Sequence, residues 1–185
     1  IGVYGGKGSP DGLRRVAFIV GISDYTELAS LPNARRDAAV MANALAELGF
    51  DSVEFAENLK RDDLRKIPAI VAEKAAQADV VLMFYAGHGV ETGGANYLIA
   101  ADAVPDSDDN LRNDALALAD LTAAAAKARR GALVIIDACR DDPFVEARAV
   151  ARSRGSGGRS SGAIPDRLHA GLAPTPAAQN GIVLH

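Results

Sequence analysis

Continuous apolar runs mark the strands of a buried sheet. The three longest runs are V-A-F-I-V-G at 16–21, D-V-V-L-M-F-Y at 79–85 and A-L-V-I-I-D-A at 132–138. Runs without polar alternation are typical of strands that are buried on both faces of a parallel sheet. A shorter alternating run at 51–56 predicts a further strand, and the Gly93-Gly94 pair predicts the turn of a small hairpin within 90–101.

Helical spacing of apolar residues lies between these runs. In residues 33–48 apolar side chains recur every three or four positions and Gly49 follows, which predicts a helix with one buried stripe. Residues 61–76 predict a second helix that Pro68 should bend or restart, and the Ala-rich residues 116–130 predict a third. Alternating strands and helices predict an α/β three-layer sandwich with a mostly parallel central sheet flanked by helices.

Three segments carry neither pattern, and a fourth carries an incomplete strand pattern. The Gly-rich residues 1–14 predict a lead-in segment without regular structure, and the Asp-rich residues 102–114 predict a solvated loop. The Arg, Ser and Gly residues of 146–162 predict a flexible exposed loop. The final G-I-V-L-H at 181–185 predicts the opening of another strand, cut off inside the fold or at a processing point. We therefore predict one domain over 15–185.

Composition narrows the class of protein without naming a function. The 185 residues are 49% hydrophobic and 24% charged, which suits one soluble domain. A net charge of -4 argues against a nucleic-acid partner, and no apolar run reaches the roughly 18 residues of a membrane span. The single cysteine, Cys139, allows no internal disulfide and favours a cytoplasmic protein, although a targeting segment could precede Ile1.

Two reactive side chains stand at the ends of apolar runs. Cys139 follows one run directly and precedes Arg140, whose positive charge favours a thiolate. His88 lies between two glycines, which should leave the imidazole ring reachable and the backbone N–H of Gly89 free to approach a substrate. In open sheets ligands bind beyond the carboxyl ends of the strands. If the two strands are neighbours, thiol and imidazole can meet, although each residue alone also suits a structural role.

These residues resemble the caspase, metacaspase and orthocaspase clan of cysteine peptidases. The similar motifs are Y-A-G-H-G at 85–89 and D-A-C-R-D at 137–141, with R-V-A-F-I-V-G-I-S-D-Y at 15–25 and G-L-A-P near 171 extending the resemblance. The caspase signature Q-A-C-[RQG]-G, with its histidine about 50 residues upstream, is matched in spacing and in three letters. D-A-C-R-D-D-P-F is similar to the bacterial branch. The resemblance implies Cys139 as nucleophile, His88 as general acid and base, and the N–H groups of Gly89 and Cys139 as oxyanion donors.

The resemblance also bears on specificity. Asp137 stands where the caspase signature has Gln, and a carboxylate there resembles metacaspases and orthocaspases, which cleave after Arg or Lys. An anionic pocket would bind a basic side chain by a charge-assisted hydrogen bond. Asp24, after the first strand, is a second candidate for that pocket. Its alternative role is that of a turn residue in S-D-Y.

Two loops acquire possible roles under this resemblance. Autoprocessing could occur at the loop 146–162, whose basic residues are Arg148, Arg152, Arg154 and Arg159, although an ordinary solvated linker fits equally. Calcium activation, known for some metacaspases, could involve Asp102, Asp106, Asp108 and Asp109. These residues lack the ligand spacing of an EF-hand, so a solvated loop without any cofactor is the simpler interpretation.

Three functional classes remain to be compared. The first is an endopeptidase that acts on a protein or peptide substrate, with a regulatory or C-terminal segment as a further partner. The second is a caspase-fold module that has lost activity and acts in regulation, against which the retained His88 and Cys139 argue. A nucleotide-binding Rossmann domain is disfavoured because G-I-S-D-Y, not G-x-G-x-x-G, follows the first strand.

Overall fold

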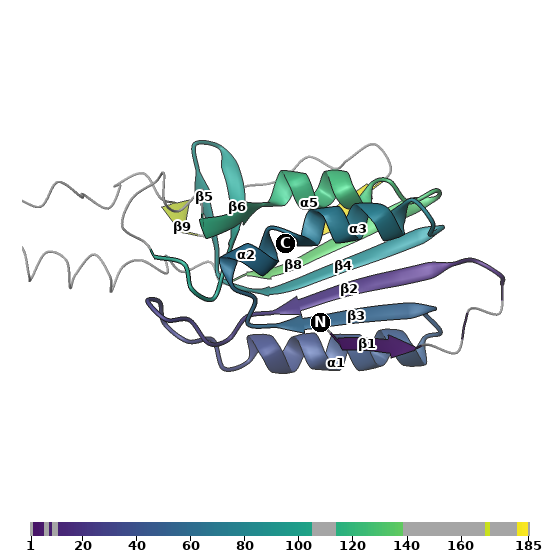
Figure 1. The fold of residues 1–185 in the computed structure, drawn as a ribbon, viewed down its shortest axis with the longest axis horizontal. Helices are drawn as coiled ribbons and strands as arrows, with labels where there is room; N and C mark the ends of the chain where they lie inside the picture. Colours follow the sequence, from purple (N-terminus) through teal and green to yellow (C-terminus); the bar gives the residue numbers. More distant parts are fainter. Residues whose placement is uncertain are drawn as a thin grey trace, which may run out of the picture.

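A six-stranded sheet forms the centre of the molecule (Figure 1). The computed structural model describes residues 2–5, 8, 11–104, 114–138, 169–170 and 181–184. The strand order is β1 (Gly2–Gly5), β3 (Ser52–Glu57), β2 (Arg15–Gly21), β4 (Val80–Gly87), β8 (Gly131–Ala138) and β10 (Gly181–Leu184). All neighbours are parallel except β1, which is antiparallel to β3. The predicted mostly parallel sheet is confirmed.

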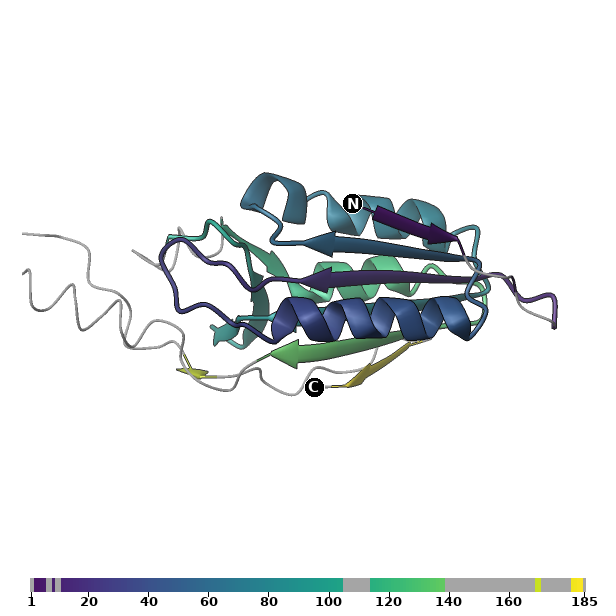
Figure 2. The ribbon, with the colours of Figure 1, turned by 90° about the horizontal axis from the view of Figure 1, so that it is seen from below.

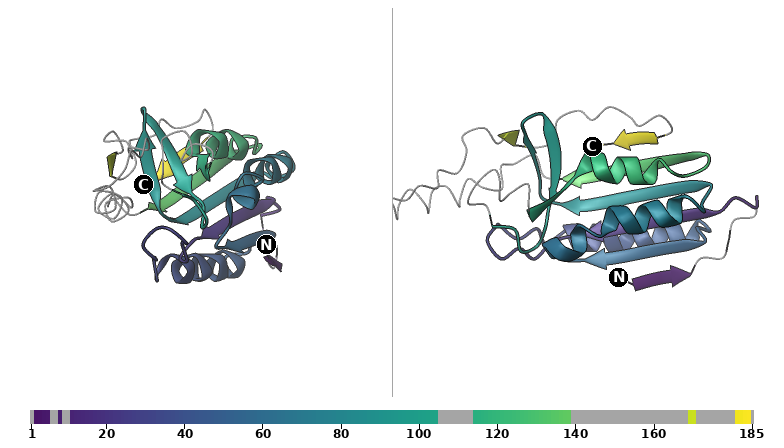
Figure 3. Two further views of the ribbon diagram at one scale, coloured as in Figure 1. Left: turned by 60° about the vertical axis from the view of Figure 1, so that its left-hand side comes forward. Right: turned by 45° about the horizontal axis from the view of Figure 1, so that its top comes forward.

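Helices cover both faces of this sheet. The helix α1 (Ala34–Glu47) lies on one face (Figure 2), while α3 (Ile67–Ala75) and α5 (Leu118–Ala125) lie on the other, with the short α2 (Arg61–Leu64) beside them. The left view of Figure 3, turned by 60° from Figure 1, shows the resulting three layers. The predicted α/β sandwich with helices on both sides is therefore confirmed.

Alternate residues of the central strands form two separate hydrophobic cores. Phe18 of β2 packs in the larger core with α3 and α5, whereas Ile19 packs in the smaller core with α1. The stripe of α1 is mostly alanine, so the helix lies close to the sheet. A Cβ added at Gly21 would lie 2.7 Å from the Cβ of Ala38. Close packing of small residues thus brings the start of α1 against the carboxyl end of β2.

A second, antiparallel sheet stands at the carboxyl ends of the central strands (Figure 3). Its order is β7 (Ala115–Ala117), β6 (Ala95–Ile99), β5 (Gly89–Thr92) and β9 (His169–Ala170). The turn between β5 and β6 uses Gly93 and Gly94 with φ of 61° and 80°, values that glycine adopts readily. The predicted Gly-Gly hairpin is therefore confirmed.

Some predicted boundaries were wrong. Residues 2–5 form β1, although 1–14 carried no strand pattern, because pairing with the edge of β3 supplies the hydrogen bonds. The predicted helix at 116–130 is shorter, since β7 pairs with β6 before α5 begins. Pro68 does restart the second helix, in the first turn of α3. The loop 146–162 and residues 105–113 lie outside the described residues.

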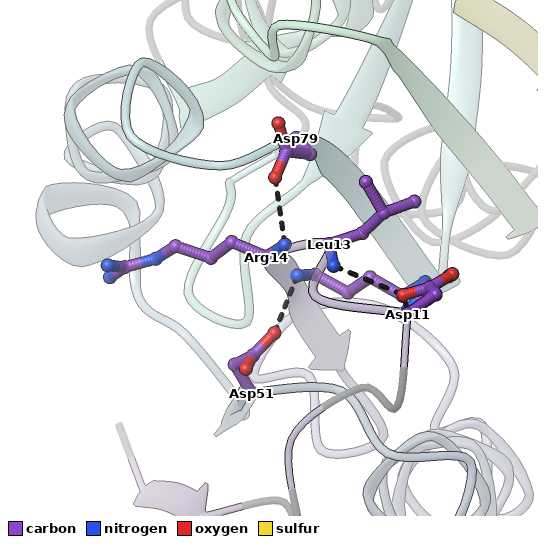
Figure 4. Close-up of polar contacts among 6 residues, drawn as sticks. Asp11, Leu13, Arg14, Asp51 and Asp79 are labelled. Carbon is purple, nitrogen blue, oxygen red and sulfur yellow. Dashed lines mark hydrogen bonds and ion pairs between the residues drawn. The ribbon is translucent and has the colours of Figure 1, made fainter.

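Aspartates hold the amino end of β2 between its two neighbours (Figure 4). The Asp79 carboxylate accepts the backbone N–H of Arg14 at 2.9 Å, and its own N–H donates to the Arg14 carbonyl at 2.8 Å. Asp51 and Arg15 form the same reciprocal pair, at 2.7 and 2.9 Å. The Arg15 guanidinium also donates to both oxygens of Asp11. These bonds fix where β2 starts relative to β3 and β4.

Candidate active site

The two strands that precede the candidate catalytic residues are neighbours. β4 and β8 pair in parallel, and Gly87 is aligned with Ala138. His88 follows Gly87 in the sequence, and Cys139 follows Ala138. Cys139 itself lies outside the described residues. The thiol and the imidazole can meet if the two strands are adjacent and end at the same edge of the sheet. The pairing of β4 with β8 fulfils this condition.

The His88 side chain is buried, so the prediction of a reachable ring was wrong. His88 is 4% exposed, and the ring centroid of Tyr25 lies 4.5 Å from that of the imidazole, with the planes tilted by 50°. The Nε2 atom lies 2.8 Å from the carbonyl oxygen of Ala29. The glycine before His88 makes room for neighbouring protein groups and does not open the ring to solvent.

The contacts of the imidazole define which nitrogen can act as a base. A carbonyl oxygen only accepts, so the Ala29 contact places the proton of the neutral ring on Nε2. Nδ1 is buried and has no hydrogen-bond partner among the described residues. Burial lowers the pKa of His88, and the Ala29 hydrogen bond offsets this shift only in part. The ring is therefore set to be neutral near pH 7, with its Nδ1 lone pair available.

A conformationally strained asparagine fixes the loop that covers His88. Asn58 has a φ of 46°, in the left-handed region, and its Oδ1 accepts the N–H groups of Ser23 and Asp24 at 2.9 and 3.1 Å. The Ser23 hydroxyl accepts the N–H of Arg35 at 2.9 Å. This network ties the loop after β2, which carries both Tyr25 and Ala29, to the end of β3 and the start of α1.

The candidate pocket residues lie at the same edge but in different settings. Asp24 accepts the Asn58 Nδ2–H at 2.7 Å and lies 3.5 Å from the guanidinium of Arg35. Asp137 is exposed at the end of β8, beside Ala86 of β4. Gly89 opens β5 and is buried against β6. Two carboxylates and one candidate oxyanion donor thus come from elements that surround His88.

Sequence reasoning missed several groups that surround the imidazole. Tyr85 stands inside the Y-A-G-H-G motif and Tyr25 inside S-D-Y, so both were present in quoted motifs without a role. Ala29 contributes a main-chain oxygen, which no side-chain pattern reveals. Asn58 is the one residue with a local indication, because asparagine tolerates positive φ better than most residues.

Neither a metal site nor a membrane span emerges from the described residues. They contain no group of three or more His, Cys, Asp or Glu side chains arranged to hold a metal ion. Asp102, one of the four aspartates considered as possible calcium ligands, accepts the backbone N–H of Arg61 at 2.7 Å. Asp106, Asp108 and Asp109 lie outside the described residues. Within the described ranges no helix combines the length and apolar character needed to cross a bilayer.

Two features indicate the class of this protein. The fold is an α/β sandwich, and a buried histidine lies at the carboxyl edge of its sheet. Residues 14–181 match the family model of the caspase domain. The chain belongs to the caspase domain family. This finding confirms the resemblance inferred from the motifs around His88 and Cys139.

Solved structures are similar to this chain, and the one with a TM-score above 0.5 shows the same fold. The crystal structure of a protein from Geobacter sulfurreducens is similar with a TM-score of 0.53 and 18% identity, over 74% of this chain and 55% of the other. The structure of pro-sf-caspase-1 matches with a TM-score of 0.49 and 22% identity, over 70% of this chain and 52% of the other. The chain thus spans about half the length of each. A search of curated proteins found no match.

Proposed function

We propose that this chain is the catalytic domain of a cysteine endopeptidase, with Cys139 as nucleophile and His88 as general acid and base. The observation that carries the proposal is the parallel pairing of Gly87 with Ala138, because the two reactive residues follow these positions in the sequence. Membership in the caspase domain family supports a cysteine peptidase of this type. A regulatory module without activity is disfavoured because both reactive residues are retained.

The contacts of His88 suggest how the reaction would proceed. Nδ1 would accept the thiol proton of Cys139, and the thiolate would attack the scissile carbonyl carbon. The N–H groups of Gly89 and Cys139 would donate to the oxyanion of the tetrahedral intermediate. The imidazolium would then protonate the leaving amine, and water would hydrolyse the thioester with His88 again as base. Throughout these steps the Ala29 carbonyl would hold the ring through Nε2.

Charge at the site favours substrates with Arg or Lys before the scissile bond. Asp137 is exposed two residues before the candidate nucleophile in the sequence, and Asp24 adjoins Tyr25, which contacts His88. Asp24 already contacts one guanidinium, that of Arg35. A carboxylate that binds an arginine of its own chain has the chemistry to bind one from a substrate. A basic substrate side chain would compete with Arg35 at Asp24 and meet Asp137 directly.

Three finer proposals accompany this function. The basic residues of 146–162 would be substrates of the same activity, which would make the enzyme self-processing. Catalysis would need no cofactor, and any activation by calcium would act through the acidic segment 102–114. A regulatory or C-terminal segment is proposed as a further partner of the domain.

The first test is hydrolysis of fluorogenic peptides that end in Arg, Lys or Asp, with and without calcium. We expect the intact chain to cleave after Arg or Lys, Cys139→Ala to be inactive, and Asp137→Asn to lose most of its preference for basic residues. Cleavage only after Asp would retain the Cys139–His88 pair and overturn the pocket assignment. A folded chain that cleaves none of the peptides, even with calcium, would favour the regulatory module.

A further inference from the structure

Two tyrosine hydroxyl groups hydrogen-bond to the main chain of His88, one at its N–H and the other at its carbonyl oxygen. The Tyr25 hydroxyl oxygen accepts the N–H of His88 at 2.8 Å. The Tyr85 hydroxyl donates to the carbonyl oxygen of His88 at 2.8 Å and lies 3.1 Å from that of Ile99. Both side chains are buried, Tyr25 at 8% and Tyr85 at 0% exposed. One hydroxyl comes from the loop after β2 and the other from β4, so the His88 peptide joins two elements.

The space around Gly87 shows how tightly these hydroxyls converge. A Cβ at Gly87 would lie 2.6 Å from the Tyr85 oxygen and 2.8 Å from the Tyr25 oxygen, distances that real Cβ atoms do not show. Gly87 does not have a positive φ, so its backbone conformation is open to any residue. Glycine is needed here for space alone. The residue before His88 must therefore be small enough to leave room for the two hydroxyls.

Tyr25 contacts both the main chain and the ring of His88. Besides accepting the N–H, it places its aromatic ring against the imidazole, with centroids 4.5 Å apart. Four residues further along the same loop, the Ala29 carbonyl binds Nε2. The loop thus contacts His88 at the backbone N–H, at the ring and at one ring nitrogen. At the other main-chain group, Tyr85 and the Ile99 N–H, at 3.0 Å, both donate to the His88 carbonyl.

We propose that Tyr25 and Tyr85 are positioning residues for His88. By fixing the His88 peptide on both sides, they fix the direction of its side chain, which keeps Nε2 on the Ala29 carbonyl and leaves Nδ1 for the Cys139 proton. The inference rests on the proposed peptidase function. Because neither hydroxyl is assigned a contact with substrate, its loss should lower kcat and leave KM nearly unchanged. Misplacement of a catalytic group by a fraction of an ångström is enough for about a tenfold loss.

The test compares Tyr25→Phe and Tyr85→Phe with Tyr97→Phe. Each change removes only a hydroxyl, and Tyr97, half-buried on β6, serves as the matched control because none of its described contacts is with His88. Activity on an Arg peptide is measured at a temperature where every variant is folded. We expect kcat to fall about tenfold in the first two variants and less than twofold in the control. Equal kcat in all three variants would overturn the proposal, even if Tyr25→Phe or Tyr85→Phe melted at a lower temperature.

A second measurement separates this inference from the proposed function. Nitrogen NMR of the histidine rings reports which nitrogen carries the proton, and the chain has only three histidines. The signals of His88 are assigned as those missing from the spectrum of His88→Asn. In the Cys139→Ala background we expect His88 to be protonated at Nε2. Tyr25→Phe and Tyr85→Phe should each shift part of the population to the other tautomer, whereas Tyr97→Phe should not. An unchanged tautomer would overturn the positioning role, while absence of peptidase activity from the intact chain would overturn only the function.

Discussion

Polar groups at the two ends of the central strands differ in their hydrogen bonding. At the amino end, Asp51 exchanges a pair of hydrogen bonds with Arg15, the first residue of β2, and Asp79 does so with the preceding Arg14, so carboxylate and backbone groups satisfy one another. At the carboxyl end, His88 is buried with Nδ1 lacking a partner among the described residues, and burial lowers the pKa of the ring. Buried polar atoms normally have a hydrogen-bond partner, so a purely structural role does not explain a buried nitrogen without one.

We interpret this as a difference between groups that set the register of the strands and a group positioned for the proposed reaction. The aspartates lie in turns that join one element to the next, where they are half-buried or exposed. His88 is held by groups from three separate segments: Tyr25 and Ala29 in one, Tyr85 in β4, and Ile99 in β6. The Ala29 carbonyl contacts the imidazole, whereas Tyr85 and Ile99 bind the main-chain carbonyl. Substitutions at the amino end should therefore change stability, whereas substitutions at the carboxyl end should change activity by more than their effect on stability.

His88→Asn gives the largest expected effect. Asparagine cannot accept and return a proton as imidazole does, so kcat/KM on a basic peptide should fall by about 10²- to 10⁴-fold. Circular dichroism should show that the variant is folded at the assay temperature. If His88→Asn keeps more than a tenth of the parent activity, His88 is not the general base.

Gly87→Ala should have the next largest effect, with Gly5→Ala as its control. The added methyl group would displace the Tyr25 and Tyr85 hydroxyls, and overpacking of this kind costs about 1–3 kcal/mol of stability. Activity should fall by about tenfold or more because His88 moves with its peptide. A Cβ at Gly5 would meet nothing within 4 Å, so that variant should match the parent in both measurements. Full activity in Gly87→Ala would show that the hydroxyls are not needed where they lie.

Asp79→Ala and Asp51→Ala should act on stability alone. Each removes the acceptor for one N–H at the start of β2, which should lower the free energy of unfolding by about 1 kcal/mol. Urea denaturation measures this change, and kcat/KM of the folded variant should stay within twofold of the parent. The matching Asn variants keep an oxygen acceptor and should lose less. A large loss of activity in either Ala variant would contradict the division between the two ends.

The smallest effect concerns pH. Unfolding returns His88 to an ordinary pKa of about 6.5, above its lowered pKa in the folded chain. As the pH falls below about 6.5, the unfolded chain takes up this proton first, so the free energy of unfolding decreases until the pH passes the folded pKa. Comparison of the parent with His88→Asn between pH 7 and 4.5 isolates this part, because all other titrating groups are shared. Parallel pH profiles for the two proteins would contradict a lowered pKa.

The sequence predicted the parts of the fold that are encoded in local pattern. The apolar runs of β2, β4 and β8 and the restart at Pro68 could be recognised because each follows from a few adjacent residues. β1 and β7 could not, since they are short and depend on a free strand edge from a distant part of the chain. The burial of His88 was missed for the same reason. It depends on a loop that Asn58, more than 30 residues further along, holds in place.

The Ala29 carbonyl gives the site an unusual kind of mutational robustness. A main-chain oxygen is present whatever amino acid occupies position 29, so no single codon change there deletes it. The tautomer of His88 depends instead on the side chains that shape the loop, such as Tyr25 and Asn58. A saturation library should therefore show wide tolerance at position 29 and narrow tolerance at positions 25 and 58. The oxygen can be weakened selectively only by chemical synthesis, with an ester in place of the following amide.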